Sequence, residues 1–159
     1  MMSTDYIVAS LPALAFGEAP SISEEAFAEL VAGRCEKELA RWAELETELR
    51  NAMAAARGGA KFAREAKGCS IYWRNRVSDC FQEKDILKRD ELLDRVWWDA
   101  AGELTPSASP LGAGALATYA VRLKIARKRA AISRDGGAAA FDKSLPDTSI
   151  SQFQSKETI

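Results

Sequence analysis

The chain has 159 residues, of which 47% are hydrophobic and 28% charged, and its formal net charge is −1. This length and composition are typical of one globular domain and exclude a disordered chain. The sequence contains no histidine, which excludes Ser-His-Asp and Cys-His triads, His-containing zinc sites and a histidine general base. No apolar stretch approaches about 18 residues and nothing resembles a signal peptide, so we expect a cytoplasmic protein without membrane insertion.

The N-terminal segment contains the most strand-like run of the sequence. Residues 6–11 are mostly apolar and include β-branched side chains, whereas the rest of the chain is rich in alanine and favours helix. Pro12 ends the strand-like run, and after it the chain continues through Leu14 and Phe16 as an extended arm. We expect a short strand or an extended arm that lies on helices.

Two helices are predicted next. Ser23 is a typical N-cap, followed by two glutamates in the first turn, and Gly33 either breaks or weakens this helix. A second, amphipathic helix of about five turns follows and ends at Arg57-Gly58-Gly59. Its apolar stripe recurs at steps of three and four: Cys35, Leu39, Trp42, Leu45, Leu49 and Met53.

Apolar and aromatic residues between 60 and 90 indicate one or two helices, with Gly68 as a break. Asp90 is the predicted cap of a helix over 91–101, and a Ser/Pro-rich loop follows. Ser109 and Pro110 then predict a helix that continues to about residue 133. The fold class is therefore all-α, a bundle of about four to six helices with an extended N-terminal arm. We expect one domain over 1–141 and a flexible tail over 142–159.

Each motif that could form a catalytic or ligand-binding site lacks a residue or a structural element that such a site requires. Gly112–Ala117 matches the string of a dinucleotide-binding loop, but that loop requires a preceding strand, so small residues packed in a first helical turn are favoured. Acidic pairs at helical spacing, Glu25/Glu29 and Glu44/Glu48, are typical of a solvated helix face. Cys35, Cys69 and Cys80 are expected to be buried thiols. We predict no catalytic, cofactor or metal site, and no enzyme.

Charge distribution favours binding over catalysis. Residues 1–60 hold five Lys/Arg and ten Asp/Glu, whereas residues 105–159 hold eight and four. A basic cluster lies on the predicted last helix: Arg122, Lys124, Arg127, Lys128 and Arg129. These residues either complement the helix dipole or bind an acidic protein, and the lack of interleaved aromatic residues disfavours nucleic acid. Trp73 and Trp98 lie off the best apolar stripes, so core packing and an interface are both open to them.

The opening Tyr6–Pro12, with Phe16-Gly17-Glu18 and residues 22–25, resembles the bacterial family known as domain of unknown function 2764. Genes of that family are typically found among V-type ATPase subunits. Residues 49–52, 91–98 and 119–125 also look like its later blocks, and the resemblance runs from about residue 6 to residue 141. Residues 91–98 are similar, too, to the all-helical V-type ATPase C/d subunit, the socket between rotor shaft and membrane ring, although this chain is far shorter.

The resemblance implies a non-catalytic helical subunit or assembly factor of a bacterial V-type ATPase, peripheral to the membrane-bound complex, with ATPase subunits as partners. The resemblance implies no cofactor and no small-molecule substrate. An alternative from the residues alone is a freestanding helical adaptor that binds an acidic protein or nucleic acid through its basic last helix.

Overall fold

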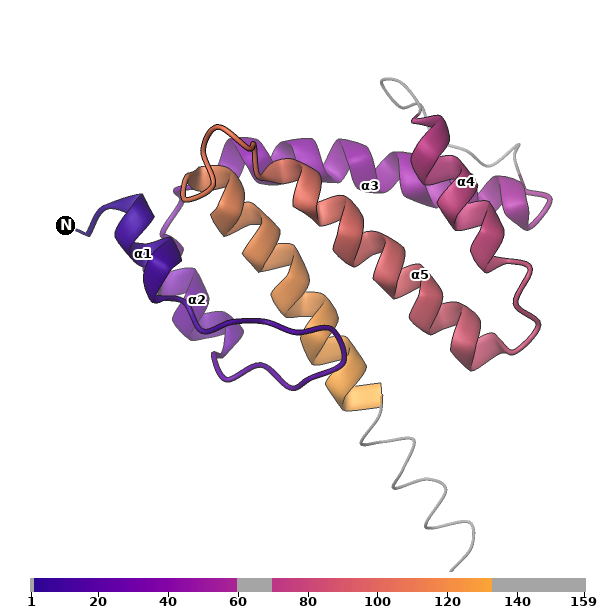
Figure 1. Cartoon of the computed structure of the whole chain (residues 1–159), viewed down its shortest axis with the longest axis horizontal. Coiled ribbons are helices and arrows are strands. Elements are labelled where there is room, and N and C mark those ends of the chain that lie inside the picture. The colour runs from indigo at the N-terminus through magenta and orange to yellow at the C-terminus, as the bar shows by residue number, and fades with distance from the viewer. Residues whose placement is uncertain (1, 60–69, 133–159) are drawn as a thin grey trace, which may run out of the picture.

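The computed structural model describes residues 2–59 and 70–132 (Figure 1). Every regular element in these two ranges is helical, which confirms the all-α prediction. The elements are α1 (Thr4–Ser10), α2 (Glu24–Val31), α3 (Glu36–Ala56), α4 (Ile71–Cys80), α5 (Ile86–Ala101), the short 3-10 turn η2 (Gly102–Leu104), and a helix over 113–132.

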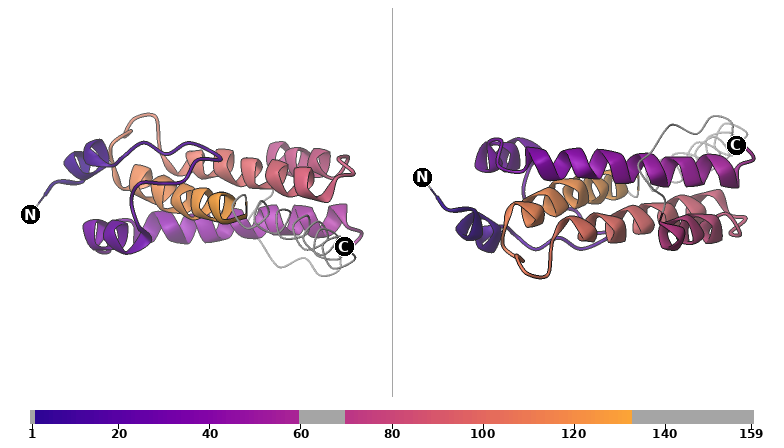
Figure 2. Two further views of the ribbon diagram at one scale, coloured as in Figure 1. Left: turned by 90° about the horizontal axis from the view of Figure 1, so that it is seen from below. Right: turned by 90° about the horizontal axis from the view of Figure 1, so that it is seen from above.

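The helices form an elongated bundle. Seen edge-on in Figure 2, α2 and α3 lie on one side, α4 and α5 on the other, and the 113–132 helix lies between them. At one end α4 packs against both α3 and α5, while α1 and α2 lie at the opposite end. The most deeply buried side chains come from several of these elements: Ile7, Leu49, Val77, Val96, Leu104, Leu116 and Leu123.

The predicted N-terminal strand is wrong, because residues 4–10 form α1. A single extended run with no partner strand would leave its backbone groups unpaired, whereas a helix pairs them locally. Only Ile7 of this helix is buried, and Tyr6 is 60% exposed. The extended arm begins instead at Leu11, and its Leu14 and Phe16 pack against the core.

The predicted boundaries of the next two helices are confirmed. The Ser23 hydroxyl accepts a hydrogen bond from the backbone N–H of Ala26 at 3.1 Å. After Val31 the chain turns through left-handed conformations at Ala32 (φ 40°) and Gly33 (φ 79°), so Gly33 does mark a break. Because glycine adopts positive φ without strain, it also suits position 58 (φ 79°), immediately after the end of α3.

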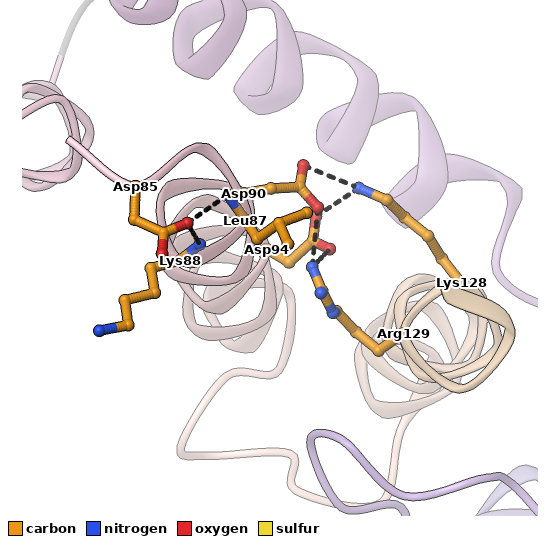
Figure 3. Close-up of polar contacts among 7 residues, drawn as sticks. All are labelled: Asp85, Leu87, Lys88, Asp90, Asp94, Lys128 and Arg129. Carbon is orange, nitrogen blue, oxygen red and sulfur yellow. Dashed lines mark hydrogen bonds and ion pairs between the residues drawn. The ribbon is translucent and has the colours of Figure 1, made fainter. Parts of the chain in front are cut away.

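Two predicted helix starts are displaced. The N-cap of α5 is Asp85, whose carboxylate accepts the N–H groups of Leu87 and Lys88, so the helix begins five residues before the predicted position. Asp90 lies inside α5 and faces another helix (Figure 3). The last helix begins at 113 rather than at Pro110, because the preceding residues form a turn in which Gly112 N–H bonds to Ser109 O.

The glycine-rich string lies where the 113–132 helix begins, and it serves close packing. A Cβ atom added at Gly114 would overlap the backbone carbonyl oxygen of Leu104 in η2. The hydroxyl of Thr118, one turn later, donates to the carbonyl of Ala101 at 2.9 Å. Small side chains here let the helix approach η2 and the end of α5, as the sequence favoured. The predicted tail over 142–159 and Cys69 lie outside the described residues.

Candidate docking groove

Trp73 and Trp98, for which the sequence left core packing and a partner interface both open, are buried at 6% and 7% exposure. The indole N–H of Trp73 donates to the Glu103 carboxylate at 2.6 Å. Trp98 packs edge-on against Phe16 of the arm, with ring centroids 5.6 Å apart. Neither side chain presents a face to a partner, so of the two roles left open by the sequence these tryptophans have that of core packing. The arm that covers Trp98 comes from about eighty residues earlier in the chain, which helical periodicity cannot show.

Arg122 of the basic cluster also faces inward. Its Nε donates to the carbonyl oxygen of Trp98 at 3.0 Å, and its guanidinium lies over the Trp98 ring, 5.2 Å from the centroid. Burial lowers the pKa of Arg122. This residue therefore ties the 113–132 helix to α5 and is not available to a partner.

Lys128 and Arg129 form an ion cluster with two aspartates of α5, Asp90 and Asp94 (Figure 3). Lys128 Nζ lies 2.9 Å from Asp94, and one Arg129 nitrogen lies 2.8 Å from Asp90 and 2.9 Å from Asp94. Burial alone lowers the Arg129 pKa, but hydrogen bonding and charge from Asp94 and Asp90 outweigh it, and the net shift is upward. The cluster joins α5 to the 113–132 helix.

Lys124 and Arg127 are the two remaining members of the predicted basic set. Both side chains are exposed, and neither forms an ion pair with a residue in the described ranges. The structure thus divides the basic cluster. Arg122, Lys128 and Arg129 hold the fold together, whereas Lys124 and Arg127 are open to solvent.

Lys124 lines a groove of about 620 Å³ where α3, α5 and the 113–132 helix meet, which we call the α3–α5 groove. Its apolar lining comes from all three helices: Met53, Ala54, Leu93, Trp97 and Ile125. Its basic lining residues are Arg50, Arg57, Lys124 and Lys128, and its acidic ones are Glu46, Asp90 and Asp94. The groove therefore combines hydrophobic surface with charges of both signs.

The charges of the α3–α5 groove do not balance. Lys128 and Arg129 neutralise the two aspartates of α5, and Arg50 pairs with Glu46 at 3.3 Å. The guanidinium of Arg57 lies over the Phe81 ring, 5.5 Å from its centroid, and forms no ion pair with a described carboxylate. Among the described residues, Arg57 and Lys124 are thus left as cations without an ion-pair partner beside an apolar surface.

Trp97 is half-buried and lines this groove. Its indole N–H donates to Glu46 at 3.3 Å, and Glu46 also accepts from Arg50. An aromatic ring held in place by a hydrogen bond is a common anchor for a protein partner.

Within the two described ranges, no group of three or more Cys, Asp or Glu residues is arranged to hold a metal ion. No helix there has the length and apolar character needed to cross a membrane. Comparison with protein-family models, with curated proteins and with solved structures finds no match to this chain. The family resemblance stated above therefore stays a prediction.

Cys35 and Cys80 are buried free thiols, and burial raises the pKa of each above the ordinary 9.0. Cys69 is replaced by serine so that only these two thiols react. At pH 8 we expect Cys35 and Cys80 to react with a disulfide reagent at least about tenfold more slowly in the native than in the unfolded protein. Absorbance of the released thiolate measures the rate. Native reaction as fast as that in denaturant would contradict the buried placement.

Proposed function

We propose that this protein is a non-catalytic helical adaptor that binds an acidic segment of another protein in the α3–α5 groove. The observation that carries this proposal is the pair of unpaired cations, Arg57 and Lys124, beside the apolar lining formed by Met53, Trp97 and Ile125. An apolar surface supplies affinity through burial, and the cations favour an acidic partner and speed its association.

We further propose that the partner is a subunit of a bacterial V-type ATPase, which the protein joins at the cytoplasmic side as a peripheral subunit or assembly factor. This part rests on the resemblance of residues 6–141 to the family whose genes lie among those subunits. The helical fold agrees with such a role, as does a groove whose lining comes from three helices.

Co-purification tests the proposal. The full chain carrying an affinity tag is expressed at its own locus, and gently solubilised membranes are analysed for ATPase subunits. We expect these subunits to co-purify with the wild-type protein and to fall at least about tenfold in the Arg57→Glu/Lys124→Glu variant, with weaker recovery at high salt.

Lys37→Glu/Arg41→Glu is the matched control, because it reverses two exposed cations of α3 that do not line the groove. It should retain the ATPase. Absence of ATPase subunits from the wild-type sample would contradict the ATPase assignment. A different acidic protein that is lost with the groove variant but kept by the control would identify the freestanding adaptor instead.

A further inference from the structure

A second groove, of about 520 Å³, lies between α2, the start of α3 and the 113–132 helix, and we call it the α2–α3 groove. Its apolar lining includes Phe27, Val31, Leu39 and Leu123. Leu39 belongs to the predicted core stripe of α3, yet it is 37% exposed. Cys35, the first residue of the stripe, is buried, whereas Leu39 one turn later is not fully covered by any described element.

The rim of this groove is acidic. Glu24 and Glu25 come from the first turn of α2 and Glu36 from the first turn of α3. None of the three forms an ion pair with a described residue, and Lys124 is the one cation among the lining residues. Glutamates in a first turn complement the helix dipole, but the dipole does not account for the exposed apolar side chain of Leu39 that lies among them.

We infer that the α2–α3 groove binds a basic amphipathic helix of a partner protein. Apolar side chains at i, i+3 or i+4 and i+7 of that helix would pack on the exposed Leu39, Ala28 and Ala32, above a floor that includes the buried Phe27. This is the usual way a helix fills such a groove. Lysine or arginine side chains flanking them would meet the three glutamates. The acidic rim repels phosphate groups, and this disfavours nucleic acid and anionic lipid as occupants.

The inference goes beyond the proposed function, because it assigns a second docking surface of opposite charge. Lys124 lines both grooves, so the two surfaces are neighbours along the 113–132 helix. An adaptor with an acidic and a basic surface side by side can hold two oppositely charged helices next to each other. The acidic N-terminal part of the sequence thus supplies the glutamates of the α2–α3 groove.

Selection from a displayed library of random 16-residue peptides on the full-length protein tests the inference. We expect enriched peptides that carry Lys or Arg around apolar residues at helical spacing. A synthetic peptide of that sequence should lose at least tenfold in affinity for the Glu24→Gln/Glu25→Gln/Glu36→Gln variant. It should bind normally to Glu18→Gln/Glu29→Gln/Glu91→Gln, which alters three exposed glutamates that do not line the groove.

Three outcomes would overturn the inference: no enrichment of basic over acidic peptides, equal affinity of the selected peptide for both variants, or a wild-type dimer that dissociates when the groove glutamates are replaced. The last would make a second copy of the chain the occupant. Failure of the proposed function is distinguishable, because absence of ATPase subunits from the wild-type sample would leave binding of the basic peptide to the wild-type protein unchanged.

Discussion

Gly114→Ala should destabilise the protein by about 3 kcal/mol, although alanine is ordinarily the better helix former by about 1 kcal/mol. The added Cβ would overlap the carbonyl oxygen of Leu104 and would lie 3.0 Å from the Pro106 ring. Because the first of these contacts is with backbone, no side-chain rotation relieves it, and η2 must move away from the 113–132 helix.

Gly112→Ala is the matched control for this substitution. A Cβ at position 112 would meet its nearest neighbours, atoms of Ser109, at 3.6 Å, which is an ordinary van der Waals contact. We expect its effect to stay within about 0.5 kcal/mol. Urea unfolding followed by tryptophan fluorescence measures both changes. Equal stability of the two variants would contradict the close approach at Gly114.

Asp94→Ala should cost about 2 kcal/mol, because it removes the more buried of the two carboxylates that Arg129 contacts. The side chains of Asp94 and Arg129 are 12% and 13% exposed, so water replaces the lost partner poorly. The value stays below that for a fully buried pair because Asp90 still contacts Arg129 at 2.8 Å.

Asp90→Ala provides the control, since Asp90 contacts the same two cations but is 43% exposed. We expect a loss of about 0.5 kcal/mol, in the range of surface pairs. Chemical denaturation of Asp94→Ala, Asp90→Ala and Arg129→Ala, and of the two double variants that combine Arg129→Ala with each aspartate substitution, gives the coupling energies. A larger loss for Asp90→Ala than for Asp94→Ala would show that solution packing differs from the arrangement in Figure 3.

Features with local causes were predictable from the sequence. Ser23 caps a helix through its own side chain, and Gly33 ends it through a backbone conformation that favours glycine. The stripe from Cys35 to Met53 predicted α3 because one helix face repeats at fixed spacing. Gly114 was also interpreted correctly, because the absence of a preceding strand left close packing as the explanation.

Features that depend on contacts distant in sequence were not predictable in the same way. The arm that buries Trp98 and the aspartates that pair with Arg129 lie far from their partners along the chain. The sequence did contain one signal of this ion cluster. Asp90 and Asp94 are four residues apart and therefore share one helix face, and their charge is opposite to that of Lys128 and Arg129. The α3–α5 groove involves three helices, so only the structure could assemble it.

Site-specific photo-crosslinking in cells tests the central claim most directly. Thr47, which lines the α3–α5 groove, is replaced by the photoreactive residue p-benzoylphenylalanine, with Lys37 of α3, which does not line this groove, as the control position. We predict that position 47 crosslinks to a V-type ATPase subunit and that position 37 does not. Absence of an ATPase crosslink at position 47, or equal crosslinking at both positions, would contradict docking in the α3–α5 groove.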